Sequence, residues 1–241
     1  MKIEVCSTSL QGIKNAAQAG ADRIELCTGL ELGGITPSKG LVEQAVKLKL
    51  LDIHCLIRPR AGHFNYSKEE VAIIERDILY AREVGCRGVV VGALTHKFQL
   101  DYSLLAHWKQ LAGSMYLTFH RAIDVVVDPK NAIEQLIQLN FDCILSSGQQ
   151  EKAVDGLREL KIWQEVYGKQ ILIMPGSGIN KDNCVLFKSE GFNAIHLSGS
   201  IVNPPIEVPD GVNKEISFLK QQWSESDVSK IKDVVRLVNP S

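Results

Sequence analysis

Short stretches in which every second residue is aliphatic recur along most of the chain, and a segment with helical periodicity follows each of them. A period of two residues predicts a strand with one apolar face, and a period near 3.6 residues predicts an amphipathic helix. The strands expected from this pattern are residues 2–6, 22–27, 52–58, 88–94, 115–123, 143–147, 170–174 and 194–198. The helices expected between and after them are residues 10–19, 40–49, 67–84, 101–111, 128–139, 153–167, 180–191 and 226–238.

Local signals mark the ends of two of these helices. Ser67 and Glu70 form the Ser-x-x-Glu pattern of a capping box, and Gly85 follows the last turn of the same helix. Asp128 precedes Pro129, which stands at the first helical position, where its missing N–H group costs nothing. These residues support helices at 67–84 and 128–139.

The alternation of strand and helix, repeated about eight times, predicts parallel strands joined by helical crossovers. An open doubly wound sheet shows the same alternation, but eight repeats without a break between domains favour a closed TIM-like (β/α)8 barrel. We therefore expect a single α/β domain over residues 1–241. Residues 202–222 interrupt the alternation with Pro204, Pro205 and Pro209 and are expected to form a long loop before the C-terminal helix.

The polar residues of the expected strands share one parity. Alternate residues of a barrel strand face the axis, and the aliphatic set has to face the surrounding helices. The residues then expected to face the axis are Glu4, Cys6, Glu25, Cys27, His54, Arg58, Thr118, His120, His196 and Ser198. Buried ionisable groups are costly without a partner or a chemical role, so this lining predicts a functional site. A structural ion pair, such as Glu25 with Arg58, is the alternative explanation.

Composition argues against several classes of protein, among them nucleic-acid-binding and membrane-spanning proteins. The chain has 27 Lys and Arg, 28 Asp and Glu and a formal net charge of -1, a balance that argues against a nucleic-acid-binding protein. The chain starts with a strand-like pattern rather than a signal peptide, and no apolar run approaches the roughly 18 residues that span a bilayer. We expect a cytoplasmic protein without a membrane partner.

The cysteines suggest a metal. None of the six is part of a Cys-x-x-Cys motif, so zinc-finger spacing is absent and free thiols are expected. Cys6 and Cys27 would end two consecutive strands on the same inward side, and neighbouring strands lie about 4.8 Å apart. Two thiolates at that separation suit Cu(I), since soft sulfur ligands select it. Two small buried thiols without a metal remain the simpler alternative.

Glycine-rich segments after the last two strands suggest an anion site. Residues 175–180 and 196–200 place backbone N–H groups where barrels often bind phosphate. The residues expected to bind such a ligand are Arg58, Arg60, Arg121, Ser147, Gly176, Gly178, His196 and Ser198. Glu25 and His120 are candidates for acid/base catalysis, with Asp124 as a partner for a histidine. No Rossmann or P-loop fingerprint is present.

Taken in order, several segments of the chain resemble the CutC family, named for copper homeostasis. They are residues 4–6, 19–27, 33–38, 57–60, 64–67, 118–124, 144–149 and 174–179. The resemblance implies a TIM-like barrel in a cytoplasmic, copper-associated protein that forms a homodimer or a higher homo-oligomer, with Cys6 and Cys27 as Cu(I) ligands. Three segments depart from the family pattern, namely residues 61–64, 95–97 and 202–222.

Two functions follow from these observations. The first is a copper homeostasis protein that binds Cu(I) through Cys6 and Cys27. The alternative is a TIM-barrel enzyme that acts on a small anionic or phosphorylated metabolite, with Glu25 and His120 as its acid/base residues. Neither function calls for a nucleic acid.

Overall fold

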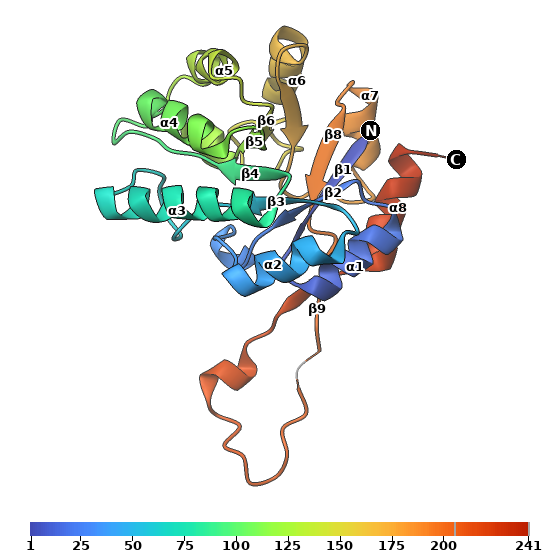
Figure 1. Ribbon diagram of the computed structural model, residues 1–241. Coiled ribbons are helices and arrows are strands. Elements are labelled where there is room, and N and C mark those ends of the chain that lie inside the picture. The colour runs from blue at the N-terminus through green and yellow to red at the C-terminus, as the bar shows by residue number, and fades with distance from the viewer. Residues whose placement is uncertain (205, 241) are drawn as a thin grey trace.

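The computed structural model describes residues 1–204 and 206–240, so Pro205 of the expected loop lies outside the described residues. An eight-stranded parallel sheet, in the order β7-β6-β5-β4-β3-β2-β1-β8, curls until its two edge strands lie close to one another (Figure 1). A Cβ atom on Gly176, after β7, would lie 3.2 Å from the Cβ of His196 in β8. The expected TIM-like barrel is thereby confirmed, in a nearly closed form, with helices around the outside.

The elements follow one another as the sequence pattern predicts. The strands are β1 (Lys2–Ser7), β2 (Arg23–Leu26), β3 (Asp52–Leu56), β4 (Gly88–Val91), β5 (Tyr116–Phe119), β6 (Cys143–Ser146), β7 (Leu172–Pro175), β8 (Ala194–Leu197), β9 (Ser200–Val202) and β10 (Ser224–Ser226). The α-helices are α1 (Leu10–Ala19), α2 (Lys39–Leu48), α3 (Lys68–Val84), α4 (Tyr102–Ala112), α5 (Pro129–Gln138), α6 (Leu157–Tyr167), α7 (Cys184–Ser189) and α8 (Val228–Val238). Short 3₁₀ helices are η1 (Leu30–Leu32), η2 (Arg121–Val125) and η3 (Ser217–Lys220).

The predicted helix signals are present. The Ser67 side chain accepts from the Glu70 N–H, and the Glu70 side chain accepts from the Ser67 N–H, which completes the capping box of α3. Gly85 ends that helix with a φ of 92°, a left-handed conformation that glycine adopts without strain. Asp128 caps α5 ahead of Pro129.

Two separate environments confirm the inward and outward parity of the strands. Aliphatic residues such as Ile3, Val5 and Ile24 are buried in the layer between the sheet and the helices. The barrel interior holds two small apolar clusters instead, one around Cys6 and Cys27 and the other around Cys143. Buried polar and charged residues fill the rest of that interior, so the chemistry of the protein lies inside the barrel. Over the described residues, the buried polar set is Glu4, Ser7, Arg23, Glu25, His54, Arg58, Thr118, His120, Ser146, Ser147, His196 and Ser226. Of these, Ser7 and Ser146 have the outward parity of Val5 and Ile144.

Some elements are shorter than the sequence pattern predicts. The strand expected at 115–123 ends at Phe119, because the His120 side chain accepts from the Ala122 N–H and starts η2. The helix expected at 153–167 begins only at Leu157, since Gly156 packs so closely that a Cβ there would lie 1.9 Å from the Ser147 carbonyl oxygen. A side-chain hydrogen bond to a backbone N–H group thus competes with regular structure at His120, and a close backbone contact does so at Gly156.

Among the described residues of 202–222, only Val202, at the end of β9, and the η3 helix have regular structure, in agreement with the expected loop. Strands β9 and β10 pair antiparallel, with Ser224 opposite Val202, and η3 lies between them. The segment that joins β9 to β10, residues 203–223, we call the extension. It projects away from the barrel as the orange ribbon of Figure 1.

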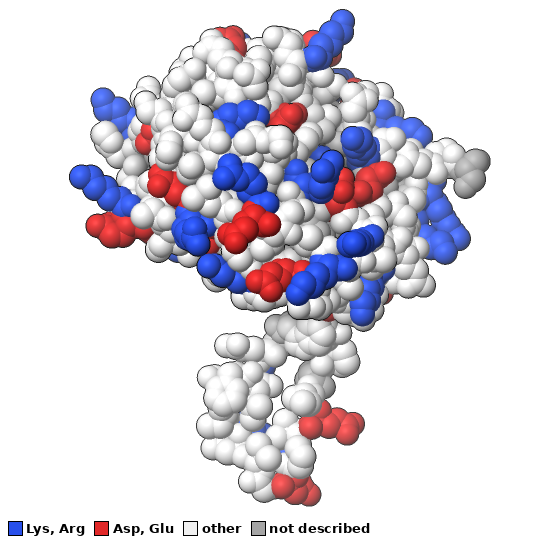
Figure 2. All heavy atoms as spheres, viewed as in Figure 1, with Lys and Arg blue, Asp and Glu red and all other residues white. Residues whose placement is uncertain are grey.

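Charges are distributed evenly on the side of the molecule shown in Figure 2. Lys and Arg residues are interspersed with Asp and Glu residues over the barrel, and the extension is mostly uncharged from this side. Large apolar side chains of the extension are exposed, Phe218 at 69% and Trp223 at 62%. Among the described residues, no helix has the length and apolar character that crossing a membrane requires.

Candidate functional site

A cavity of about 280 Å³ opens at the carboxyl ends of the barrel strands. This end is where barrels of this kind carry their functional sites. Most of the sequence-predicted site residues line it, namely Cys6, Glu25, Cys27, Arg58, His120, Arg121, Gly178, His196 and Ser198. Arg60, Asp124, Ser147 and Gly176 are not among the lining residues.

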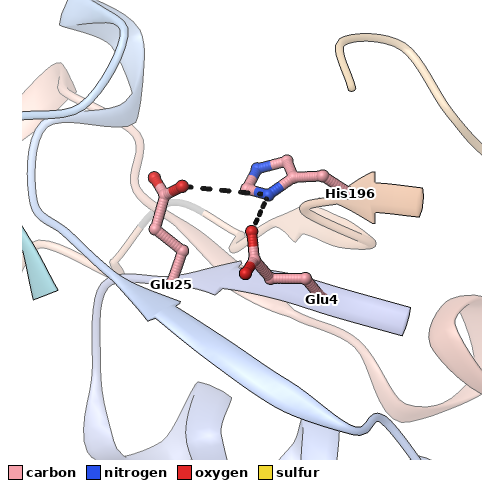
Figure 3. A group of neighbouring side chains, drawn as sticks. All are labelled: Glu4, Glu25 and His196. Carbon is pink, nitrogen blue, oxygen red and sulfur yellow. Dashed lines mark hydrogen bonds and ion pairs between the residues drawn. The ribbon is translucent and has the colours of Figure 1, made fainter. Parts of the chain in front are cut away.

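Glu4, Glu25 and His196 lie together beside this cavity, on the neighbouring strands β1, β2 and β8 (Figure 3). His196 Nδ1 lies 2.8 Å from Glu4 Oε1 and 3.8 Å from Glu25 Oε2. Since Glu4 accepts, Nδ1 carries the proton. All three side chains are at least nine-tenths buried, so their charges interact with little screening by water.

Burial and mutual contact change the acidity of these groups. Burial opposes ionisation of Glu4, but the hydrogen bond from His196 and the charge of Arg23 lower its pKa to about 2. Burial, together with the nearby Glu4 charge, raises the pKa of Glu25 to about 7. Burial alone would lower the pKa of His196, yet Cys6, Glu25 and Glu4 around the ring raise it well above its usual value. Near neutral pH, Glu25 can therefore gain or lose a proton.

Arg23 forms an ion pair with Glu4 of this group. Its Nε donates to Glu4 Oε2, and its guanidinium lies 4.9 Å from the centre of the Tyr116 ring. Burial by itself would lower the pKa of Arg23, but Glu4, together with Cys143 and Tyr116, raises it above its usual value, so Arg23 stays a cation. The sequence pattern predicted that Glu4 faces the barrel axis, but we expected no site role for Glu4 or Arg23. The parity that Arg23 shares with Glu25 was the signal that could have identified it.

The two thiols expected to bind copper are close together. Cys6 and Cys27 belong to one buried cluster with Leu56 and Val90, and both line the cavity. Burial raises the pKa of the Cys27 thiol well above its usual range, and the neighbouring Cys6 raises it further. All six cysteines are free. A cation at this wall would compensate the Cys27 thiolate, which burial otherwise disfavours.

His120 is a neutral imidazole in the wall of the cavity. Its Nδ1 accepts from the Ala122 N–H at 3.2 Å, which places the ring proton on Nε2. Burial and the nearby Arg58 charge lower its pKa to about 3. The Nε2 atom is buried without a partner among the described residues. It is thus a hydrogen-bond donor available to a ligand.

The arginines expected to bind an anion are largely engaged by the protein. Arg58 donates to the carbonyl oxygens of Leu32, Gly34 and Gly62, and only its buried Nε has no partner among the described residues. Arg60 pairs with Glu70, outside the cavity lining. Arg58 therefore holds together the loops that form the rim, and its Nε remains as a donor without a partner among the described residues.

Asp124 has partners other than the histidine that we expected beside it. It accepts from the Ser146 hydroxyl at 2.5 Å, from the N–H and hydroxyl of Ser147, and from Arg121 Nε at 2.8 Å. The η2 helix turns its side chain toward the end of β6, where these donors lie. Among the hydrogen bonds of the described residues, none joins Asp124 to a histidine.

The glycine and serine residues of the expected anion site divide between two places. Gly178 and Ser198 line the cavity, whereas Gly176 packs between β7 and β8, where a Cβ would lie 2.4 Å from Leu145 Cδ1. Ser147 is buried and bound to Asp124. Gly176 and Ser147 therefore have structural roles at the carboxyl end of the barrel and do not line the cavity.

One group of possible metal ligands stands out among the described residues. Glu4, Glu25 and His196 each offer a ligand atom within 4.8 Å of the others. The Cys6 and Cys27 sulfurs form a second, softer donor pair in the same cavity.

Residues 1–201 match the family model described as CutC family. The chain is 42% identical over 200 residues to a Pasteurella multocida protein named family protein CutC, across 83% of this chain and 82% of that protein. It is 34% identical over 238 residues to a Caenorhabditis elegans protein named copper homeostasis protein cutC homolog, across 97% of this chain and 92% of that protein. A crystal structure of CutC from Streptococcus agalactiae, 32% identical, superposes with a TM-score of 0.78 and covers 82% of this chain and 98% of that one.

Proposed function

Since this chain belongs to the CutC family, we propose that it is a copper homeostasis protein that binds Cu(I) through the thiols of Cys6 and Cys27. The observation that carries the proposal is the position of the two thiols. They come from neighbouring strands and lie in one buried cluster at the wall of the cavity. The name of the C. elegans relative gives independent support for copper.

The chemistry of this donor pair fits Cu(I). Thiolates are soft ligands, and Leu56 and Val90 surround them with apolar atoms rather than with the oxygen ligands that hard cations prefer. Because burial and the nearby Cys6 raise the pKa of Cys27, binding has to release protons, and the affinity should increase with pH. When bound, copper would be the cargo of the protein.

A Cu(I) titration under reducing conditions, against a chromophoric Cu(I) chelator, tests the proposal. We expect one equivalent of Cu(I) to bind to the unaltered protein and to be lost in the double variant Cys6→Ser/Cys27→Ser. Cys143→Ser is the matched control, since Cys143 is also buried in the barrel interior but lies in the other cluster. Unchanged affinity in the double variant would reject the thiol pair as the copper site.

A second candidate function is enzymatic and has its own observation. Arg58 Nε and His120 Nε2 are buried donors without partners among residues 1–204 and 206–240, and both residues line the cavity. Unpaired buried donors favour an acceptor such as an anionic or phosphorylated metabolite. Glu25, with a pKa of about 7, could then act as the acid/base. Crystals soaked in phosphate would test this function, and the absence of an anion near both donors would count against it.

The proposal also covers the cellular compartment and the oligomeric state of the protein. We place it in the cytoplasm because all six cysteines are free thiols, which a reducing compartment maintains. We propose a homo-oligomer because the extension has exposed apolar side chains, including Phe218 and Trp223. A second copy of the chain, bound at the extension, would bury them.

A further inference from the structure

Glu4, Glu25 and His196 resemble a preformed set of ligands for a cation harder than Cu(I). Two carboxylate oxygens and one imidazole nitrogen lie within 4.8 Å of one another, on strands that the sheet holds side by side. Glu4 is the register partner of His196 across β1 and β8, so this spacing is fixed by the backbone ladder. Figure 3 shows the carboxylate groups of both glutamates directed toward the same imidazole nitrogen.

Glu25 is the member of the group that makes no hydrogen bond through Oε2, and among the described residues its only cationic neighbour within ion-pair distance is His196. Its Oε2 is buried and has no hydrogen-bond partner in the part of the chain that the structure describes, and the 3.8 Å that separate it from His196 Nδ1 exceed hydrogen-bond length. The residue is only 6% exposed. Leaving a carboxylate oxygen unpaired in such a place is costly. The missing partner therefore points to a ligand with positive charge.

The charges around the group leave room for a cation. Arg23 neutralises Glu4 through Oε2, while Glu4 Oε1 faces His196. Glu25 has no arginine or lysine within ion-pair distance among the described residues. A divalent ion at this place would replace the Nδ1 proton, which passes to solvent, and would balance the charge of Glu25.

A cation can reach this group from the cavity. Glu25 and His196 belong to the cavity wall, and Glu4 lies behind them, at 1% exposure. Three protein ligands also leave coordination positions for water or substrate, as in the catalytic sites of zinc enzymes.

We propose that Glu4, Glu25 and His196 form a binding site for a divalent first-row cation, of which Mn²⁺ is the simplest probe. Oxygen and imidazole ligands suit such ions, whereas the thiol pair suits Cu(I). The site is separate from Cys6 and Cys27 and does not depend on the copper proposal.

Titration of the full-length, chelator-treated protein with Mn²⁺, followed by the EPR signal of the free ion, tests the site. We expect one equivalent to bind. Glu25→Gln and His196→Gln should each weaken binding by about 100-fold or more, beyond the 10–100-fold effect of residues outside the ligand set. Cys6→Ser/Cys27→Ser should retain Mn²⁺ binding, and so should His54→Gln, which alters another buried histidine of the interior.

Circular dichroism and thermal unfolding establish that each variant is folded. For crystals soaked in Mn²⁺, we expect an anomalous peak at roughly 2.0–2.4 Å from an atom of each ligand. The proposal is overturned if the unaltered protein does not bind Mn²⁺ or if folded Glu25→Gln binds it equally well. Loss of Mn²⁺ in the double cysteine variant, with retention in Glu25→Gln, would assign the ion to the thiols instead. Failure of Cu(I) binding alone would leave this site intact.

Discussion

Arg23 and His54 show how single residues of the barrel interior differ in role despite their similar burial. Arg23 is ion-paired with Glu4 and stays charged. The His54 ring lies 5.1 Å from the Tyr116 ring and is uncharged, since burial lowers its pKa to about 4. Its Nδ1 has no partner among the described residues. The local partner therefore decides which interior group keeps its charge.

His54 gives a prediction for the pH dependence of stability. Its pKa is about 4 in the folded chain, against an ordinary value of 6.5. Between these pH values the unfolded chain takes up a proton that the folded chain excludes. The free energy of unfolding should therefore fall as the pH decreases from about 6.5 toward 4, with a slope of up to about 1.4 kcal/mol per pH unit from this residue.

Urea unfolding at several pH values measures this slope. The variant His54→Gln should show a shallower loss of stability in acid than the unaltered protein. His107→Gln is the matched control, because His107 is half exposed and pairs with Glu75 at the surface. Parallel curves for His54→Gln and the unaltered protein would contradict the assignment of an uncharged, buried histidine.

At the scale of elements, a close contact between backbones lies at the start of α6, and the start of α2 has no such contact among the described residues. Gly156 precedes α6 and lies against Gly148, whose own Cβ would lie 2.4 Å from the Gly156 carbonyl oxygen. Gly40, in the first turn of α2, has no such contact, since a Cβ there would meet no atom of the described chain within 4 Å. The same residue type thus has a packing role at one helix and none at the other.

These two glycines form a matched pair of substitutions. Gly156→Ala should destabilise the protein by more than about 2 kcal/mol, because backbone atoms have to move. Gly40→Ala should stabilise it by about 0.5–1 kcal/mol, since alanine favours the helix. Guanidinium unfolding midpoints measure both effects. A similar change in both variants would show that the contact of Gly156 is unimportant.

At the scale of the whole molecule, the barrel and the extension differ in composition and packing. The barrel buries its aliphatic residues between strands and helices. The extension instead leaves Ile206, Phe218 and Trp223 exposed. The family-model match ends at residue 201, just before the extension begins. The site described above thus belongs to the part of the chain shared with the family.

Removal of the extension tests this division. A variant in which residues 204–222 are replaced by Asn-Gly, a favoured hairpin turn, should unfold within a few degrees of the unaltered protein, because the barrel core is unchanged. Its sedimentation coefficient should shift toward that of a monomer if the extension joins copies of the chain. If the shortened variant is a monomer and has lost much of its thermal stability, the extension stabilises the barrel of its own chain.

The sequence by itself determined the barrel and the direction in which its side chains face. Both depend on local periodicity, so Glu25 and Cys27 could be placed inside the barrel from the alternation of residues 22–27 alone. It also indicated that Cys6 and Cys27 end neighbouring strands, and these residues do share one cluster.

Only the tertiary structure decided which polar groups meet. His196 contacts Glu4 across 192 positions of sequence, because the curled sheet brings β8 beside β1. Arg58 is directed to the carbonyl oxygens of Leu32, Gly34 and Gly62, and Asp124 to serines rather than a histidine, because loop conformations position those partners. Periodicity fixes the face on which a residue lies, whereas its partner depends on how distant segments pack against one another.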